Sequence, residues 1–207
     1  ERAIQMIALI TILALAPSIL VMVTSFTRIV VVLSLLRTAI GLQTAPPNSV
    51  MISLALFLSA FIMAPTLQQS YEAGIAPLVA GDVEIVEALE LSAGPLHEFM
   101  RAHVRPQDVM LFMDLTETPP PENPEDLELR ILIPAFMISE LRRAFEIGFL
   151  LFLPFVVIDM VVASVLMSMG MMMLPPVIIS LPFKLIFFVL VDGWHLVAGS
   201  LIRSFTG

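Results

Sequence analysis

Long runs of apolar residues, arranged in two pairs, dominate the hydrophobic pattern of this chain. A helix needs about 20 such residues to cross the ~30 Å hydrocarbon layer of a bilayer, and the runs approach or exceed that length. Proline and charged residues interrupt the second pair, which makes straight independent spans a poor description. We therefore predict an all-α membrane protein built from two kinked apolar helical hairpins. The four runs cover residues 3–27, 50–67, 147–169 and 177–202.

A polar stretch separates the two hairpins. Apolar residues recur at helix-like spacing in 82–92, and Pro95 and Pro106 each occupy a position where a new helix could begin. Residues 116–126 are too rich in proline for a helix or a strand and read as a linker. We expect three parts: a first hairpin over 1–67, an acidic, mostly helical external segment over 68–130, and a second hairpin over 131–207.

Two arginines flank the turn of the first hairpin. Pro46-Pro47 must break the helix there, and Asn48 or Ser49 can cap the next one. Because Lys and Arg gather on the cytoplasmic side of membrane helices, we interpret Arg28 and Arg37 as topology-setting. The acidic segment then lies on the opposite, extracytoplasmic side. A second interpretation of the first run is a signal peptide, because residues 14–16 resemble a cleavage site.

Composition supports a membrane protein and excludes several functions. The chain is 58% hydrophobic and 14% charged, with a formal net charge of −8. Residues 66–130 hold 13 of the 18 acidic groups, so the negative charge belongs to one segment. Nucleic-acid binding needs a basic face and is therefore not expected. The chain has no cysteine and no recognisable catalytic or phosphate-binding motif, so we expect no enzyme activity, no cofactor and no metal.

A methionine-rich turn joins the two runs of the second hairpin. Gly170 and Pro175-Pro176 prevent a continuous helix, so several thioethers must project from a short loop. Methionine is flexible and polarizable, and copies of such a loop around an axis would form a soft apolar ring. One alternative is that the methionines form the core of a simple turn. A Cu(I) site, which can use thioether ligands, is a weaker alternative. The candidate gasket residues are Met167, Met169, Met171, Met172 and Met173.

Three ionisable residues lie within the apolar runs of the second hairpin, where an unpaired charge is costly. Lys184 and Asp192 are eight residues apart, and on a continuous helix they would share a face. Pairing of Lys184 with Asp159 across the hairpin would lower the cost of both charges. An ion pair is the first interpretation. A proton or ion relay, which would make the protein an ion-coupled secondary transporter, is the alternative.

A charged helical turn leads into the third apolar run. Arg142 and Glu146 are i,i+4 neighbours and can pair on one helix face. A solvated helix entrance is one interpretation of this turn, and a subunit contact is the other. The residues concerned are Glu140, Arg142, Arg143 and Glu146.

Several of these motifs resemble one known family. The stretch 134–148 (PAFMISELRRAFEIG) resembles the FliP family of flagellar biosynthetic proteins, which are export-gate components of type III secretion. The stretches 154–159 and 182–194 agree, and Thr24-Ser25-Phe26-Thr27-Arg28 looks like the flagellar branch rather than its injectisome relatives. The resemblance covers nearly the whole chain and is weakest in the acidic segment.

The resemblance implies functions that composition alone does not. Family members assemble as several FliP copies, pentameric in the family, with FliQ and FliR, and they work with FlhA, FlhB and an ATPase. The complex passes unfolded substrates at the entrance of the secretion channel, in the inner membrane and on its periplasmic side within the flagellar basal body. The methionine loop would then be the gasket around a passing polypeptide. Whether Asp159, Lys184 and Asp192 pair or conduct is not implied by the resemblance.

Overall fold

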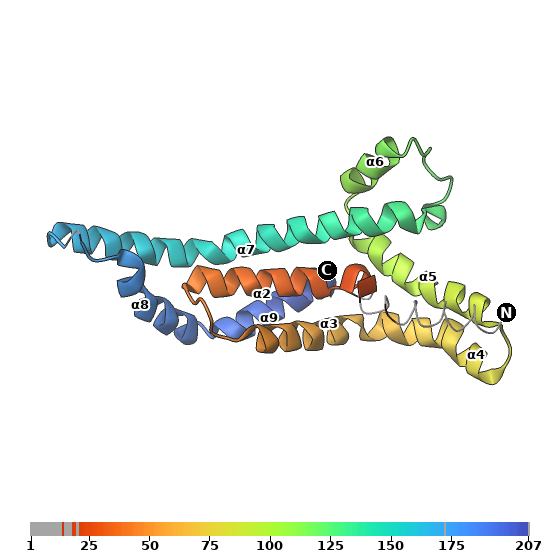
Figure 1. Cartoon of the computed structure of the whole chain (residues 1–207), viewed down its shortest axis with the longest axis horizontal. Helices are drawn as coiled ribbons and strands as arrows, with labels where there is room; N and C mark the ends of the chain where they lie inside the picture. The colour runs from red at the N-terminus through yellow and green to blue at the C-terminus, as the bar shows by residue number, and fades with distance from the viewer. Residues whose placement is uncertain (1–13, 15–17, 20, 172, 207) are drawn as a thin grey trace. The chain divides into compact units, whose positions relative to one another are not determined.

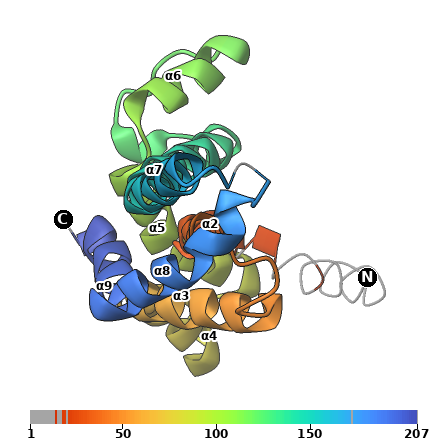
Figure 2. The same cartoon turned by 90° about the vertical axis from the view of Figure 1, so that its left-hand side faces the viewer.

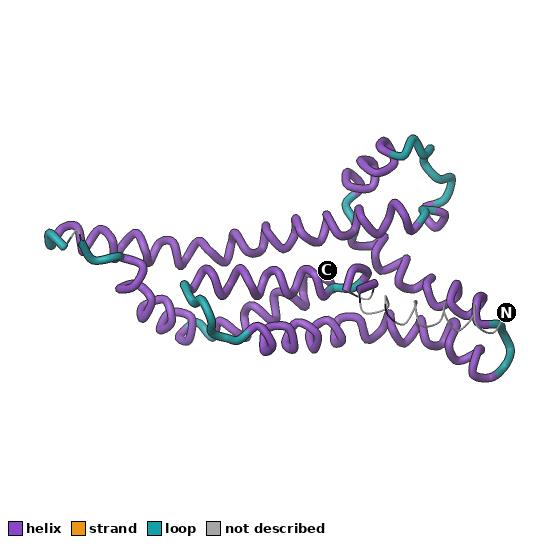
Figure 3. The backbone as a smooth tube through the Cα atoms, in the orientation of Figure 1, coloured by secondary structure: helices purple, strands orange, loops and turns teal. Residues whose placement is uncertain are grey.

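The computed structural model describes residues 14, 18–19, 21–171 and 173–206. Within these residues every regular element is helical, as Figure 3 shows. The prediction of an all-α protein is confirmed. The first apolar run and its signal-peptide interpretation fall largely on residues 1–13, 15–17 and 20, which lie outside the described residues. The helices are α2 Phe26–Ile40, α3 Asn48–Ser70, η1 Tyr71–Ile75, α4 Ala76–Ala80, α5 Ile85–His103, α6 Pro106–Leu115, η2 Pro124–Asp126, α7 Leu129–Ser168, α8 Pro176–Leu190 and α9 Gly193–Thr206.

Two continuous helical stretches are long and apolar enough to cross a membrane. They are Asn48–Ala80 and Leu129–Ser168, by length and composition within the described residues. The pair α8 and α9 passes the same test together but is bent by 63° at the break, so the described residues contain two or three candidate spans. Figures 1 and 2 show this bend from two sides. A membrane-inserted helical protein is therefore the class that the structure supports.

Proline and glycine lie at several of the helix boundaries. α2 ends at Ile40 before Pro46-Pro47, α6 begins at Pro106, and the chain between α7 and α8 contains Gly170 and Pro175. These boundaries agree with the predicted ones. The proline-rich linker also agrees, except that Pro124–Asp126 form one short 3₁₀ turn.

Pro95 does not begin a helix, and that expectation was wrong. It lies inside α5, which already starts at Ile85. A proline within a helix deprives the carbonyl four residues earlier of its donor. That carbonyl belongs to Leu91, and the residue is 43% exposed.

The chain divides into two compact units. The first comprises the described parts of 1–27 together with 59–141. Within it, η1 and α4 lie alongside α5, which Figure 1 shows as two helical stretches joined by a short loop. Gly74 permits this approach, because a Cβ there would stand 2.1 Å from the carbonyl oxygen of Ala88. The π-type turn η1 coincides with the contact, and the amide of Ala76 donates to the carbonyl of Tyr71.

The second unit comprises residues 28–58 and 142–207. Its buried residues follow one stripe of α2, with an i, i+3, i+4, i+7 spacing that is typical of a core-facing helix. These are Ile29, Val32, Leu33 and Leu36, each at most 1% exposed. Phe155, Phe188 and Trp194 add a cluster of ring contacts within the same unit.

Candidate functional site

The methionine loop forms the connection between α7 and α8. Gly170 has φ +75°, and the amides of Gly170 and Met171 donate to the carbonyls of Met167 and Leu166. This is the hydrogen-bond pattern of a glycine C-cap, in which a left-handed residue ends the helix. The loop is therefore a defined turn that follows directly from the glycine in the sequence.

Most thioethers of the loop are exposed. Met167 is 56% exposed, Met169 is 63% exposed and Met173 is 98% exposed, whereas Met171 is half-buried. Met172 lies outside the described residues. Such exposure leaves flexible apolar side chains free to contact a partner or a passing chain.

An apolar cavity of about 460 Å³ opens between α7 and α8. Its walls are aliphatic side chains and one phenylalanine, and none of the lining residues is ionisable. Little of α7 is covered, since only 11% of its most apolar 18-residue stretch is buried. Much apolar surface in this unit is thus left for lipid or for other protein chains.

Asp159 and Lys184 form an ion pair in the second unit. The Nζ of Lys184 lies 2.6 Å from Oδ2 of Asp159, and the side chains are 4% and 31% exposed. Ser180 donates its hydroxyl to the other carboxylate oxygen at 2.5 Å. Lys184 also donates to the carbonyl oxygen of Ala39 in the last turn of α2, at 3.3 Å. The group links α2, α7 and α8, and sequence reasoning missed Ser180, which lies one helical turn before Lys184.

Asp192 is not part of this group, so the expectation of a shared helix face with Lys184 was wrong. The helix that would align them ends at Leu190, and Asp192 lies in the bend between α8 and α9 with φ +52°. Its side chain is exposed. The chain turns between Lys184 and Asp192, so the helical spacing no longer applies.

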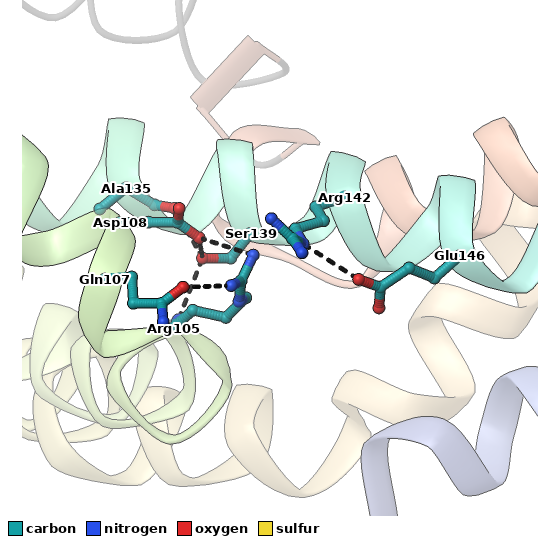
Figure 4. A network of polar contacts seen from close by, with 7 residues as sticks. All are labelled: Arg105, Gln107, Asp108, Ala135, Ser139, Arg142 and Glu146. Atoms are coloured by element: carbon teal, nitrogen blue, oxygen red, sulfur yellow. Dashed lines mark hydrogen bonds and ion pairs between the residues drawn. The ribbon is translucent and has the colours of Figure 1, made fainter.

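The charged turn on α7 separates into exposed and buried members. Figure 4 shows Arg142 and Glu146 paired along α7. Nε of Arg142 lies 3.0 Å from Oε1 of Glu146, and both side chains are more than half exposed. Arg143 is half-buried, and Glu140 is fully buried. The exposed pair adds little to stability. Its role as a subunit contact stays a prediction.

The start of α6 is capped through a residue that sequence reasoning missed. In a capping box, an acidic side chain three residues into the helix binds the amide of the N-cap residue. Here the Ser139 hydroxyl of α7 lies between the two: it accepts from the Arg105 amide at 3.0 Å and lies 2.6 Å from Oδ2 of Asp108 (Figure 4). Ser139 is fully buried. The sequence does place Asp108 three residues after Arg105, which is the spacing of a capping box. It gives no sign that Ser139 of α7 lies between them in space.

The two arginines of the first hairpin lie in different surroundings. Arg37 donates to Oδ1 of Asn48 at 2.6 Å and to the carbonyl of Pro46 at 3.2 Å, which holds the turn before α3. Arg28 is fully buried and contacts Ser204 and Phe205 at the end of α9. Their topology-setting role stays a prediction. The partners of Arg28 could not be predicted from the sequence, because they lie 176 or more positions away along the chain.

Comparison with known proteins decides the family. The model of the FliP family matches residues 9–201. The flagellar biosynthetic protein FliP of Caulobacter vibrioides is 64% identical over 205 residues, which cover 99% of this chain and 77% of that protein. The chain belongs to the FliP family.

Other FliP proteins show the same relation at greater distance. The protein of Bacillus subtilis is 52% identical over 99% of this chain and 93% of its own length. That of Aquifex aeolicus is 48% identical over 98% of this chain and 86% of its own length. The resemblance read from the motifs is confirmed, and the chain is a membrane-embedded component of the flagellar export apparatus.

Proposed function

We propose that this FliP-family chain is a non-enzymatic pore subunit of the flagellar type III export gate. In this proposal several copies, five as in the family, assemble with FliQ and FliR and work with FlhA and FlhB. Unfolded flagellar substrates pass through the channel that the copies enclose. The acidic segment 68–130 lies on the periplasmic side, and the complex lies in the inner membrane within the basal body.

The observation that carries the proposal is the exposed methionine loop between α7 and α8. Met173 is 98% exposed and Met169 is 63% exposed. Copies of the loop around an axis would close a narrow ring of thioethers. These side chains adapt their shape, so the ring would seal around substrates of different sequence.

The apolar surface beneath the loop supports an assembly of several chains. The cavity of about 460 Å³ between α7 and α8 and the uncovered length of α7 need a covering of lipid or protein. A wall segment packed against neighbouring subunits has this property. Asp159 and Lys184, which lie within the apolar helices α7 and α8, are paired with each other.

The test removes the thioethers and leaves the helices intact. Met169→Ala, Met171→Ala and Met173→Ala are combined in the complete export apparatus, and ion leak and substrate export are measured in cells. We expect a severalfold higher leak with the complex still assembled. Met160→Ala is the matched control, because Met160 is 64% exposed on α7 outside the loop. A fully assembled triple variant with unchanged leak would overturn the gasket function.

A further inference from the structure

Arg28 makes three contacts with the last turn of α9. Its Nη1 donates to the carbonyl oxygen of Ser204 at 3.0 Å and to the hydroxyl of the same residue at 2.9 Å. The guanidinium carbon lies 3.6 Å from the ring centroid of Phe205. A planar cation that binds both the carbonyl and the ring is well suited to this position.

The opposite end of α2 is held in a similar way by another helix. Lys184 of α8 donates to the carbonyl oxygen of Ala39, in the last turn of α2. The helix pair α8 and α9 is thereby attached to α2 at two places. Lys184 marks one end of α2 and Ser204 marks the other, so the pair runs antiparallel to α2.

The two attachment points explain why α8 and α9 are bent. From Arg28 to Ala39, α2 rises by only about 16 Å at 1.5 Å per residue. From Lys184 to Ser204, a straight helix would rise by about 30 Å. The 63° bend shortens that path to about 23 Å, and the long side chains of Arg28 and Lys184 take up the rest. A straight helix would leave about 14 Å for the two side chains to take up.

The bend has its own local requirements. Asp192 adopts a left-handed conformation with φ +52°. A Cβ on Gly193 would lie 2.2 Å from the ring of Phe188, so the glycine lets α9 pack against the end of α8. This close contact keeps the bend compact, and the arginine at the far end keeps α9 directed along α2.

We propose that Arg28 is a positioning residue that fixes α9 on α2 and, through α8, orients the methionine loop. α8 begins at Pro176, directly after the loop, so a change in the direction of α8 moves one end of the loop. The effect on the loop rests on the proposed gasket function, whereas the attachment of α9 does not. A residue that only sets topology needs a positive charge, and lysine would replace it. A residue that binds a carbonyl, a hydroxyl and a ring face together needs the guanidinium.

The test uses the full chain in the assembled complex and separates these two roles. The chain contains no cysteine, so Leu201→Cys gives a single thiol at a fully buried position of α9. Maleimide labelling of this thiol reports release of α9 in Arg28→Lys, Arg28→Ala and Phe205→Leu backgrounds. We expect labelling about tenfold faster in Arg28→Lys, from the lost hydrogen bond and the weaker ring contact, and less acceleration in Phe205→Leu. Arg37→Lys is the matched control and should keep the thiol protected.

Ion leak measured in the same strains tests the link to the loop. We expect leak to rise in Arg28→Lys while the orientation of the C-terminus in the membrane stays unchanged. Normal protection of the thiol in Arg28→Lys would overturn the attachment, and fast labelling with normal leak would overturn the link to the loop. The methionine variants test the gasket separately, because their failure would leave the labelling result for Arg28 standing.

Discussion

The hydroxyl of Ser139 lies 2.6 Å from Oδ2 of Asp108, which joins the buried face of α7 to the first turn of α6. The hydroxyl oxygen of Ser139 also accepts a hydrogen bond from the backbone amide of Arg105. A residue of α7 therefore completes the cap of α6. The capping box of α6 therefore exists only when α7 is packed against it. Formation of the helix and its docking are coupled by one hydroxyl group.

We expect Ser139→Ala to weaken α6 by about 1–2 kcal/mol, the usual range for a lost helix cap. The amide of Arg105 would lose its acceptor, and the carboxylate of Asp108 would lose its nearest donor. Hydrogen exchange of the backbone amides in 106–110 measures this loss. Ser139→Thr keeps the hydroxyl and should restore much of the protection. Equal exchange in the alanine variant and the parent protein would contradict the cap.

A second prediction concerns the ion pair of Asp159 and Lys184. Lys184→Met leaves a carboxylate without its partner in an apolar unit, which costs about 3 kcal/mol or somewhat less, since Asp159 is 31% exposed. The double variant Asp159→Leu with Lys184→Met removes both charges and should regain most of the stability. Thermal unfolding of the purified complex measures the difference.

The same variants distinguish the ion pair from a proton or ion relay. If the pair is structural, export recovers together with stability in the double variant. If it conducts, the double variant is stable but inactive. A stable complex with no export would therefore favour the ion-coupled alternative over the structural one.

A third prediction concerns two glycines in neighbouring helical stretches of the first unit. Gly74→Ala should destabilise the unit strongly, because the new methyl group would overlap the backbone of Ala88 and force η1 away from α5. Gly94→Ala is the matched control, since its Cβ would meet no atom within 4 Å. We expect the control to stabilise by about 0.5–1 kcal/mol, as alanine does in a helix. Similar unfolding temperatures for the two variants would refute the close contact.

A fourth prediction concerns the bend between α8 and α9. Asp192→Gly should stabilise it by up to about 1 kcal/mol, because a side chain in the left-handed region carries a cost that glycine does not. Asp192→Val should destabilise it, since β-branched residues tolerate this region least. Ser200→Gly should instead lower the stability, because Ser200 lies within α9 and glycine is unfavourable inside a helix. Unfolding of the assembled complex in detergent checks all three.

Much of the helix pattern could be predicted from local chemistry. The breaks at Pro46-Pro47 and at Gly170 follow from backbone constraints that act whatever the tertiary structure is. The expectation that Pro95 begins a helix was wrong for a local reason as well. A helix can continue through a proline at the cost of one backbone hydrogen bond. The position of Asp192 is different, because it lies in the bend between two helices that contact α2 through Lys184 and Ser204.

The sequence by itself determined that this chain is helical, suited to a membrane and a member of the FliP family, because apolar length, proline, glycine and long motifs are properties of neighbouring residues. Only the tertiary structure decided which polar groups meet. Arg28 reaches Ser204 across 176 positions of the chain, and Ser139 reaches Asp108 across 31. Buried polar groups must find partners, but the partner is chosen by packing between distant helices, and no local spacing records that choice.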